Sequence, residues 1–171
     1  MRRARSGDRD AFAELVGLHG GWVHRLAVVI VGPEEAADVT QDVLLRAWRE
    51  LPRLRDDTRF EAWLRRILVN RCRDVGRAKG RRVVEIELDP ATGAVPSADG
   101  LDTADRTVDL DAALARLSVD QRAVIALHFA ADLTLADVAA TMGLPIGTVK
   151  SRLNTALIHL RTELGRDEGN R

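Results

Sequence analysis

The sequence predicts an all-α protein made of two helical domains. Apolar residues recur at spacings of three and four along most of the chain, as in amphipathic helices, and strand-like signals are confined to the run VVEIEL. Residues 1–82 hold 18 Lys/Arg against 12 Asp/Glu, residues 83–111 hold one Arg against eight acidic residues, and residues 112–171 are nearly balanced. This division of charge predicts domains at residues 1–82 and 107–171, joined by a flexible acidic linker over residues 83–106.

The composition limits the classes of function. A hydrophobic fraction of 46% and a charged fraction of 30% are typical of a soluble globular protein. No apolar run reaches the roughly 20 residues of a membrane span, and the arginine-rich start MRRARSGDRD lacks the apolar segment of a secretory signal. The single cysteine, Cys72, excludes an internal disulfide. We therefore expect a cytoplasmic protein with no direct membrane insertion.

In the first domain, the pair Gly20-Gly21 is predicted to divide residues 11–32 into two short apolar helices. Pro33 suits the first position of the next helix, and the two glutamates that follow suit its positive N-terminal end. That helix is expected to run to about Leu51. After the polar loop RELPRLRDDTR, Thr58 is predicted to cap a helix that carries an apolar stripe and ends between Gly76 and Gly80.

In the second domain, helices are predicted at residues 107–116, 119–131, 134–141 and 146–164. Ser118 begins the second of these helices, whose Val124, Ile125, Leu127 and Phe129 are expected to form a small core. Thr134 followed by Asp137 reads as a capping box, and Gly143 suits a left-handed turn between the last two helices. The pattern predicts a helix-turn-helix, a module that usually enters the major groove of DNA.

The last helix leaves a polar face at its N-terminal end. Hydroxyl, amide and cationic groups at such a position fit contacts with phosphates and base edges. The candidate DNA-binding residues are Thr148, Lys150, Ser151, Arg152, Asn154 and Thr155. An αα-hairpin with a solvated charged face is the alternative interpretation.

A second polar surface is predicted on the helix over residues 34–51, within the motif DVTQDVLLRAW. Val39 and Val43 can face a core, which leaves an acidic and polar patch outside. The residues of this patch are Asp38, Gln41, Asp42 and Leu45. From spacing alone, a solvated surface is the better interpretation.

Four motifs occur in one order, namely GDRDAFAEL, DVTQDVLLRAW, FEAWLRRILVNRCRDVGR and LTLADVAATMGLPIGTVKSRL. Together they resemble the bacterial sigma-70 family and, within it, the extracytoplasmic-function (ECF) group, which has only the second and fourth conserved regions. The resemblance implies a sigma factor that binds core RNA polymerase, directs promoter-specific transcription initiation and assists promoter melting. We also expect no enzymatic activity and no cofactor, because the sequence shows no catalytic or nucleotide-binding pattern.

The resemblance assigns roles to residues of this chain. The acidic patch Asp38, Gln41, Asp42 and Leu45 would dock on the clamp of the largest polymerase subunit, and the flap region would be a further polymerase contact. The minus-ten promoter element, in duplex and single-stranded form, would be bound by the polar loop and the following helix. The residues implied there are Arg53, Arg55, Thr58, Arg66, Asn70, Arg73, Asp74 and Arg77. The last helix would bind the minus-thirty-five element.

This chain departs from the family pattern in its last helix, because Asn154 and Thr155 stand where members often carry a large or basic residue. Fewer cations predict a weaker phosphate contribution and a shallower salt dependence of DNA binding. The family also implies an anti-sigma factor as a partner. Two other functions stay open, namely a free-standing helix-turn-helix regulator that needs no polymerase, and a sigma-like chain that only titrates an anti-sigma factor.

No catalytic or metal-binding residue is predicted. The four histidines lack the spacing of a helical zinc site. Cys72 lies between two arginines that could lower its pKa, but the apolar stripe of its helix favours a packed thiol. No glycine-rich nucleotide loop or pair of catalytic carboxylates occurs in the sequence.

Overall fold

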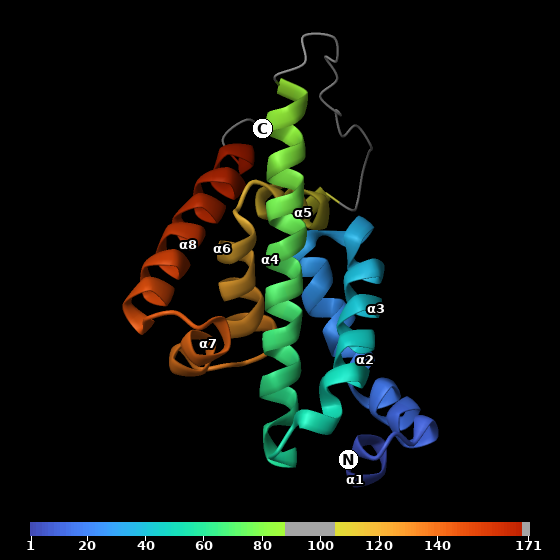
Figure 1. Cartoon of the computed structure of the whole chain (residues 1–171). Helices are drawn as coiled ribbons and strands as arrows, with labels where there is room; N and C mark the ends of the chain where they lie inside the picture. Colours follow the sequence, from blue (N-terminus) through green and yellow to red (C-terminus); the bar gives the residue numbers. More distant parts are fainter. Residues whose placement is uncertain (88–104, 169–171) are drawn as a thin grey trace.

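The structure, a computed structural model, describes the backbone of residues 1–87 and 105–168 and the side chains of residues 1–79 and 110–164 (Figure 1). Within these ranges every regular element is a helix or a helical turn, which confirms the all-α prediction. Most of the predicted acidic linker lies outside the described residues. We use "first module" for the helices before it and "second module" for those after it.

The first module is built on three long helices that pack against one another. Gly32 adopts a φ of 95°, which allows an immediate turn into the second of them, and Pro33 is its first residue as expected. Val39 and Val43 are almost fully buried on the inner face of that helix. The elements of the module are α1 (Arg2–Arg5), α2 (Arg9–Val31), α3 (Pro33–Glu50) and α4 (Phe60–Glu87).

The predicted break at Gly20-Gly21 is wrong, because α2 passes through both glycines as one helix. Glycine in a helix costs about 1 kcal/mol relative to alanine, and burial of one face of α2, including Val23 and Ile30, offsets that cost. By length and composition α2 could also cross a membrane, a test that a core helix of a folded protein passes equally well. Here α2 packs against α3, α4 and α6.

Both predicted ends of the helix that follows the polar loop are wrong. Asp56, and not Thr58, supplies the cap: its carboxylate accepts the Thr58 N–H at 3.0 Å and precedes a 3₁₀ turn over Asp57–Arg59. Helix α4 then continues past Gly76 to Glu87. No proline interrupts this stretch, and its basic residues are good helix formers.

Three of the four described α-helices of the second module are shorter than the long helices of the first, and all four begin within two residues of the predicted starts. The last helix, α8, has 23 residues and extends four residues beyond its predicted end at residue 164. Ser118 and Gln121 form a reciprocal capping box at the start of α6. At the start of α7, Thr134 accepts the Asp137 N–H at 3.2 Å, but the Asp137 carboxylate accepts from the Thr134 hydroxyl at 2.6 Å, so the predicted box is only half formed there. Gly143 ends α7 in the left-handed conformation. The elements are α5 (Asp105–Ala115), α6 (Val119–Ile125), α7 (Leu135–Met142) and α8 (Ile146–Glu168).

One predicted core residue of this module lies outside the core. Val124 and Leu127 are fully buried, but Phe129 is 60% exposed. A π-helical turn over Ala126–Ala130 follows α6 and adds a residue to the turn, which shifts the side chains that follow it relative to an α-helix. The apolar periodicity beyond Leu127 therefore does not continue into the core.

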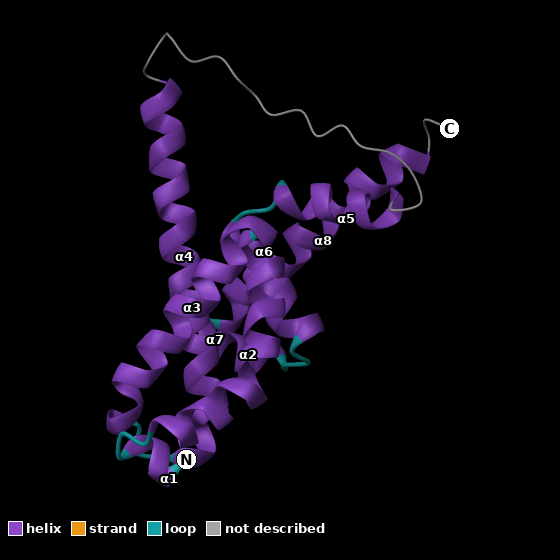
Figure 2. Ribbon diagram, turned by 90° about the vertical axis from the view of Figure 1, so that its right-hand side faces the viewer, coloured by secondary structure: helices purple, strands orange, loops and turns teal. Residues whose placement is uncertain are grey.

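The two modules pack against each other along α4. In Figure 1, α4 runs through the centre of the molecule, with α2 and α3 on one side and α6, α7 and α8 on the other. Buried side chains from both modules form one continuous cluster, which includes Leu68 of α4 and Leu127 of the second module. Figure 2 shows that the C-terminal end of α4 extends away from this body.

Candidate nucleic-acid interface

The acidic patch of α3 is largely exposed. Asp38, Gln41 and Leu45 are exposed on the outer face of the helix, and Leu45 has 46% of its surface accessible. Asp42 differs, because its carboxylate forms an ion pair with Arg71 of α4 at 2.6 Å. Three of the four predicted docking residues are therefore exposed and have no ion pair within the described residues, whereas Asp42, whose side chain is 46% exposed, also links α3 to α4.

An apolar groove lies beside this patch, with a volume of about 450 Å³. Phe12 and Val16 of α2 form one wall, and Leu44, Leu45 and Trp48 of α3 form the other. The Phe12 and Trp48 rings are 4.8 Å apart. No residue of α2 was among the predicted docking residues, because spacing within α2 does not show that α3 leaves the outer edges of Phe12 and Val16 uncovered.

The polar loop presents two arginines without ion pairs among the described residues. Arg53 and Arg55 are both exposed. Thr58 is exposed too, but its hydroxyl donates to the Asp56 carboxylate at 2.5 Å. This hydrogen bond and the one from the Thr58 N–H lower the pKa of Asp56. Asp57 binds Arg5 of α1 at 3.1 Å, which ties the loop to the N-terminus.

A hollow of about 820 Å³ lies next to this loop. Thr58 and Phe60 line it on the loop side, and Arg2, Leu18 and His19 line it on the side of α1 and α2. Leu18 is 73% exposed. Neither α1 nor Leu18 was a predicted site residue, since only the fold brings the N-terminus to the loop.

Four of the predicted residues on α4 share one exposed face. Arg66, Asn70, Asp74 and Arg77 follow one another at steps of four, four and three, which places them along one side of a helix. Arg77 forms an ion pair with Asp74. Arg66 and Asn70 have no ion pair or side-chain hydrogen bond within the described part of the chain.

Arg73 does not lie on that exposed face. Its side chain is 18% exposed, and its Nε donates to the Asp120 carboxylate of α6 at 2.7 Å. Its Nη1 also donates to the Met142 carbonyl at the end of α7, at 3.0 Å. The predicted minus-ten residues are therefore split between a solvent face and the interface between the modules.

The helix-turn-helix is formed by α7, the turn at Gly143 and the start of α8. Lys150, Ser151, Asn154 and Thr155 are exposed on α8, and Thr148 is half-buried. The arginine among the predicted residues is occupied, because Arg152 donates to the Asp120 carboxylate at 2.6 Å. Of the two predicted cations on this helix, Lys150 alone has no ion-pair partner within the described residues.

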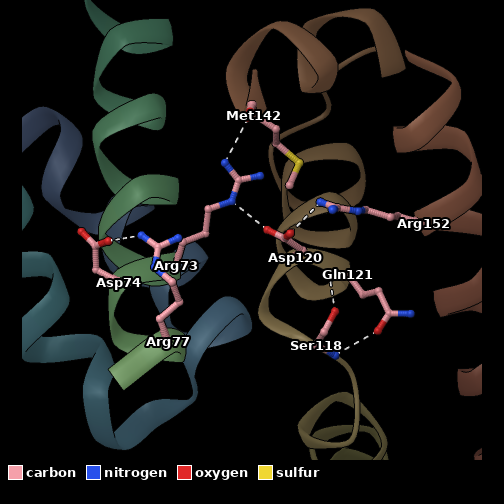
Figure 3. Close-up of polar contacts among 8 residues, drawn as sticks. All are labelled: Arg73, Asp74, Arg77, Ser118, Asp120, Gln121, Met142 and Arg152. Atoms are coloured by element: carbon pink, nitrogen blue, oxygen red, sulfur yellow. Dashed lines mark hydrogen bonds and ion pairs between the residues drawn. The ribbon is translucent and has the colours of Figure 1, made fainter. Parts of the chain in front are cut away.

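Both candidate DNA-binding surfaces therefore converge on one carboxylate. Figure 3 shows Asp120 between Arg73 of α4 and Arg152 of α8, with the Ser118–Gln121 capping box beside it. Sequence reasoning missed Asp120, because it sits 47 residues from Arg73 and 32 from Arg152 along the chain. The only local signal for Asp120 was its place in the first turn of α6, where an acidic residue is favourable.

The Cys72 thiol is packed in the interior, as the apolar stripe of its helix predicted. It is fully buried in α4, and burial raises its pKa to about 12, although Arg122 and Arg71 act in the opposite direction. Burial between the modules also lowers the pKa of Arg122. Within the described residues, no group of three histidine, cysteine or acidic side chains is arranged to hold a metal ion.

Two family models match the chain. "Sigma-70 region 2" matches residues 15–82, and "Sigma-70, region 4" matches residues 107–160. The chain is 36% identical to the ECF RNA polymerase sigma factor SigM of Mycobacterium tuberculosis, over 94% of this chain and 80% of that protein. It is 30% identical to the ECF RNA polymerase sigma-E factor of Escherichia coli, over 90% of this chain and 86% of that protein.

Solved structures with a similar fold include two complexes. The sigma factor RpoE, solved with the anti-sigma factor NepR from Bartonella quintana, has a TM-score of 0.70 and 30% identity, over 91% of this chain and 97% of that one. CnrH, solved with the cytosolic domain of CnrY, has a TM-score of 0.68 and 29% identity, over 97% of this chain and 95% of that one.

Proposed function

The chain belongs to the sigma-70 family as an RNA polymerase sigma factor of the ECF type, and on that premise we propose how its two modules divide the work. The protein binds core RNA polymerase and directs promoter-specific transcription initiation; it acts by binding, and the family is not one of enzymes. The observation that carries this function is the ordered match to both conserved regions. We place its action in the cytoplasm.

The first module is the polymerase-binding and minus-ten module, within residues 1–82. Its docking surface is the patch Asp38, Gln41 and Leu45 together with the apolar groove beside it. The pairing of Asp42 with Arg71 makes Asp42 a positioning residue that holds α3 on α4. An exposed apolar residue next to two polar ones is the usual composition of an interface, in which the apolar part supplies most of the affinity.

The exposed loop and α4 bind the minus-ten element. Arg53, Arg55 and Arg66 are free to contact phosphates, and Asn70 offers both a donor and an acceptor to a base edge. Strand opening needs no catalytic group, because binding of unstacked bases shifts the population toward the open form. Thr58 contributes through its acceptor lone pairs, since its hydroxyl hydrogen is already donated to the Asp56 carboxylate in a hydrogen bond.

The second module, within residues 107–171, reads the minus-thirty-five element through the start of α8. Lys150 would supply a phosphate contact, and the exposed side chains of Ser151, Asn154 and Thr155 would face the groove. Arg152 joins them only when it leaves Asp120. An anti-sigma factor is a further proposed partner, because the similar sigma factor RpoE was solved in complex with the anti-sigma factor NepR.

Reconstituted transcription tests the function. Core RNA polymerase of the protein's host, the purified chain and a library of host promoter fragments should give transcripts that core alone does not give. A control reaction replaces the chain with its Asn70→Ala variant, which should still bind core but open fewer promoters. Absence of chain-dependent transcripts together with absence of core binding would show the function to be wrong.

The docking surface has its own test. Leu45→Ala and a double variant, Asp38→Ala with Gln41→Ala, should each weaken core binding by about tenfold or more, the scale of a truncated interface anchor. Glu34→Ala is the matched control, because it removes an exposed acid from the same helix one turn before the patch. Equal affinity of all variants would remove the docking assignment and leave the family membership intact.

A gel shift on promoter DNA without core separates this function from that of a free-standing regulator.

A further inference from the structure

The contact between the modules uses residues that both DNA-binding surfaces need. Asp120 Oδ1 accepts from Arg73 at 2.7 Å, and Asp120 Oδ2 accepts from Arg152 at 2.6 Å (Figure 3). A carboxylate offers two anionic oxygens to guanidinium groups much as a DNA phosphate does. While these ion pairs hold, Asp120 competes with a DNA phosphate for both guanidinium groups and offsets part of their charge.

The Arg73 side chain also binds the backbone of the helix-turn-helix. Its second bond goes to the carbonyl of Met142, the last residue of α7. Carbonyls at a helix C-terminus lack partners within their helix and carry the negative end of the helix dipole, which makes them good acceptors for a cation. A residue of the minus-ten helix thus completes the end of a helix in the other module.

A glycine allows the two modules to approach this closely. Gly76 of α4 faces Val119 at the start of α6, and a Cβ added at Gly76 would lie 2.5 Å from Val119 Cγ2 and 3.2 Å from Val119 Cβ. Rotation of the valine side chain cannot relieve the second contact, because Cβ is fixed to the backbone. Glycine is a poor choice for a helix interior on its own account, so Gly76 serves the contact between the modules and not α4.

In the closed arrangement, in which the two modules pack against each other, two buried donors lack hydrogen-bond partners within the described residues. These donors are the Nε atoms of Arg65 and Arg122. Arg122 lies on α6 against the first module, close enough to Cys72 and Glu35 for electrostatic interaction. An unpartnered buried donor regains its hydrogen bonds when water reaches it. Opening the interface hydrates Arg122, which keeps the closed arrangement from being irreversible.

We propose that Asp120 is an autoinhibitory latch that holds the second module on the first by occupying Arg73 and Arg152, and that it must release before the protein engages promoter DNA. The proposal rests on the proposed function, since the arginines matter as DNA contacts. Closure lowers the apparent affinity for DNA in proportion to the fraction of molecules that are open. Contacts with polymerase or DNA then favour the open form by binding it alone.

Two variants release the latch by different means. Gly76→Ala removes the close approach to Val119 without changing charge, and alanine favours α4 as a helix. Asp120→Asn keeps the shape of the side chain and removes the ion pairs. Gly17→Ala is the control for the first, because a Cβ at Gly17 of α2 meets nothing within 4 Å. Asp132→Asn is the control for the second, since it removes one exposed acid from the same module.

The distance between the modules is the first measurement. Cysteines introduced by Ala37→Cys on α3 and His159→Cys on α8 are both at exposed positions and carry a donor and acceptor dye for energy transfer on the full chain. Cys72, which lies near Arg122 at the contact between the modules, is replaced by Cys72→Ala in every protein so that only the two introduced cysteines react. Gly76→Ala and Asp120→Asn should both increase the mean separation, and the two controls should match the wild type. An unchanged separation in Gly76→Ala would overturn the latch.

The second measurement is the affinity of the free chain for a random-sequence DNA duplex, followed by fluorescence anisotropy. If about a tenth of wild-type molecules are open, Gly76→Ala should bind the duplex roughly tenfold more tightly. Asp120→Asn should increase the affinity for the duplex by more than its charge control, Asp132→Asn, does. A wider separation without tighter binding would show that closure is not inhibitory. Failure of every protein, wild type included, to support transcription with core would refute the proposed function instead, while the two latch measurements still decide the latch.

Discussion

The first module is built on helices of 23, 18 and 28 residues, whereas the second combines α8, of 23 residues, with α6 and α7, which have only seven and eight. Isolated helices shorter than about 12 residues are marginal in water. The short helices begin at side-chain caps, Ser118 and Thr134, and α7 ends at a left-handed glycine. Helices α2 and α4 run through glycines and depend on buried faces. Local signals thus define the second module, and packing defines the first.

The same contrast holds for how each module presents its DNA-binding residues. In the first module, Asn70 and Arg66 stand on the open face of a helix whose other faces are buried. In the second, the reading helix is positioned by a turn and two caps. The effects of substitutions should therefore differ in size and in kind between the modules.

Removing a core side chain from α4 should have the largest effect. Leu68 is fully buried in the cluster shared by both modules, and Leu68→Ala should lower the free energy of unfolding by about 2–5 kcal/mol. Urea denaturation followed by circular dichroism measures this. Ile158→Ala is the control, since Ile158 is 51% exposed and its loss should change stability by less than about 0.5 kcal/mol. Similar losses in both would contradict the packing account.

Glycine substitutions should have opposite signs in the two modules. Gly143 has a φ of 65°, and Gly143→Ala should cost about 1–2 kcal/mol because alanine is strained there. Gly20→Ala should stabilise the chain by about 0.5–1 kcal/mol, since its Cβ would meet only ordinary contacts at 3.8 and 4.0 Å. Thermal unfolding of both variants measures the difference. A stabilising Gly143→Ala would refute the assigned role of the turn.

Removing the side-chain hydroxyl should lower stability at Ser118 but not at Thr58. Ser118→Ala loses a reciprocal capping box and should cost about 1 kcal/mol, whereas Thr58→Ala should leave stability nearly unchanged because Asp56 caps the 3₁₀ turn. Asp56→Ala tests the latter assignment in the same assay. A larger loss for Thr58→Ala than for Asp56→Ala would restore Thr58 as the cap.

Lowering the pH is expected to have the smallest effect on stability. Bonds from the Ala11 N–H and Arg3 lower the pKa of Asp8, and bonds from Thr58 lower that of Asp56, from an ordinary 3.8. A depressed folded pKa means that each carboxylate stabilises its turn at pH above 3.8, and that this contribution is lost as the pH falls through the lowered value. Carboxyl NMR titration should show both low values. The hydroxyl caps of the second module do not titrate, so amide exchange at Gln121 should not follow this transition.

Much of the second module could be predicted because its signals are local. Ser118, Thr134 and Gly143 act within three or four residues of themselves, so their positions in the sequence suffice. Predictions in the first module failed where a distant partner decided the outcome. Gly20 stays helical because α2 is held by α3 and α4, and α4 extends beyond Gly76, where α6 packs on it.

The candidate site divides in the same way. Periodicity placed Asp38, Gln41 and Asn70 on outer faces, and the structure leaves all three exposed. It could not show that Phe129 turns outward at a π-helical turn, nor that Phe12 borders the docking groove.

The sequence by itself determined the helical class, the order of the two regions, the turn of the helix-turn-helix and the polar faces, because each depends on spacing within a few residues. Only the tertiary structure decided which charged residues are free. Arg73 and Arg152 both read as DNA contacts, yet both are paired with Asp120. Ion pairs form between whichever charges the fold brings within about 4 Å, and separation along the chain carries no record of that distance.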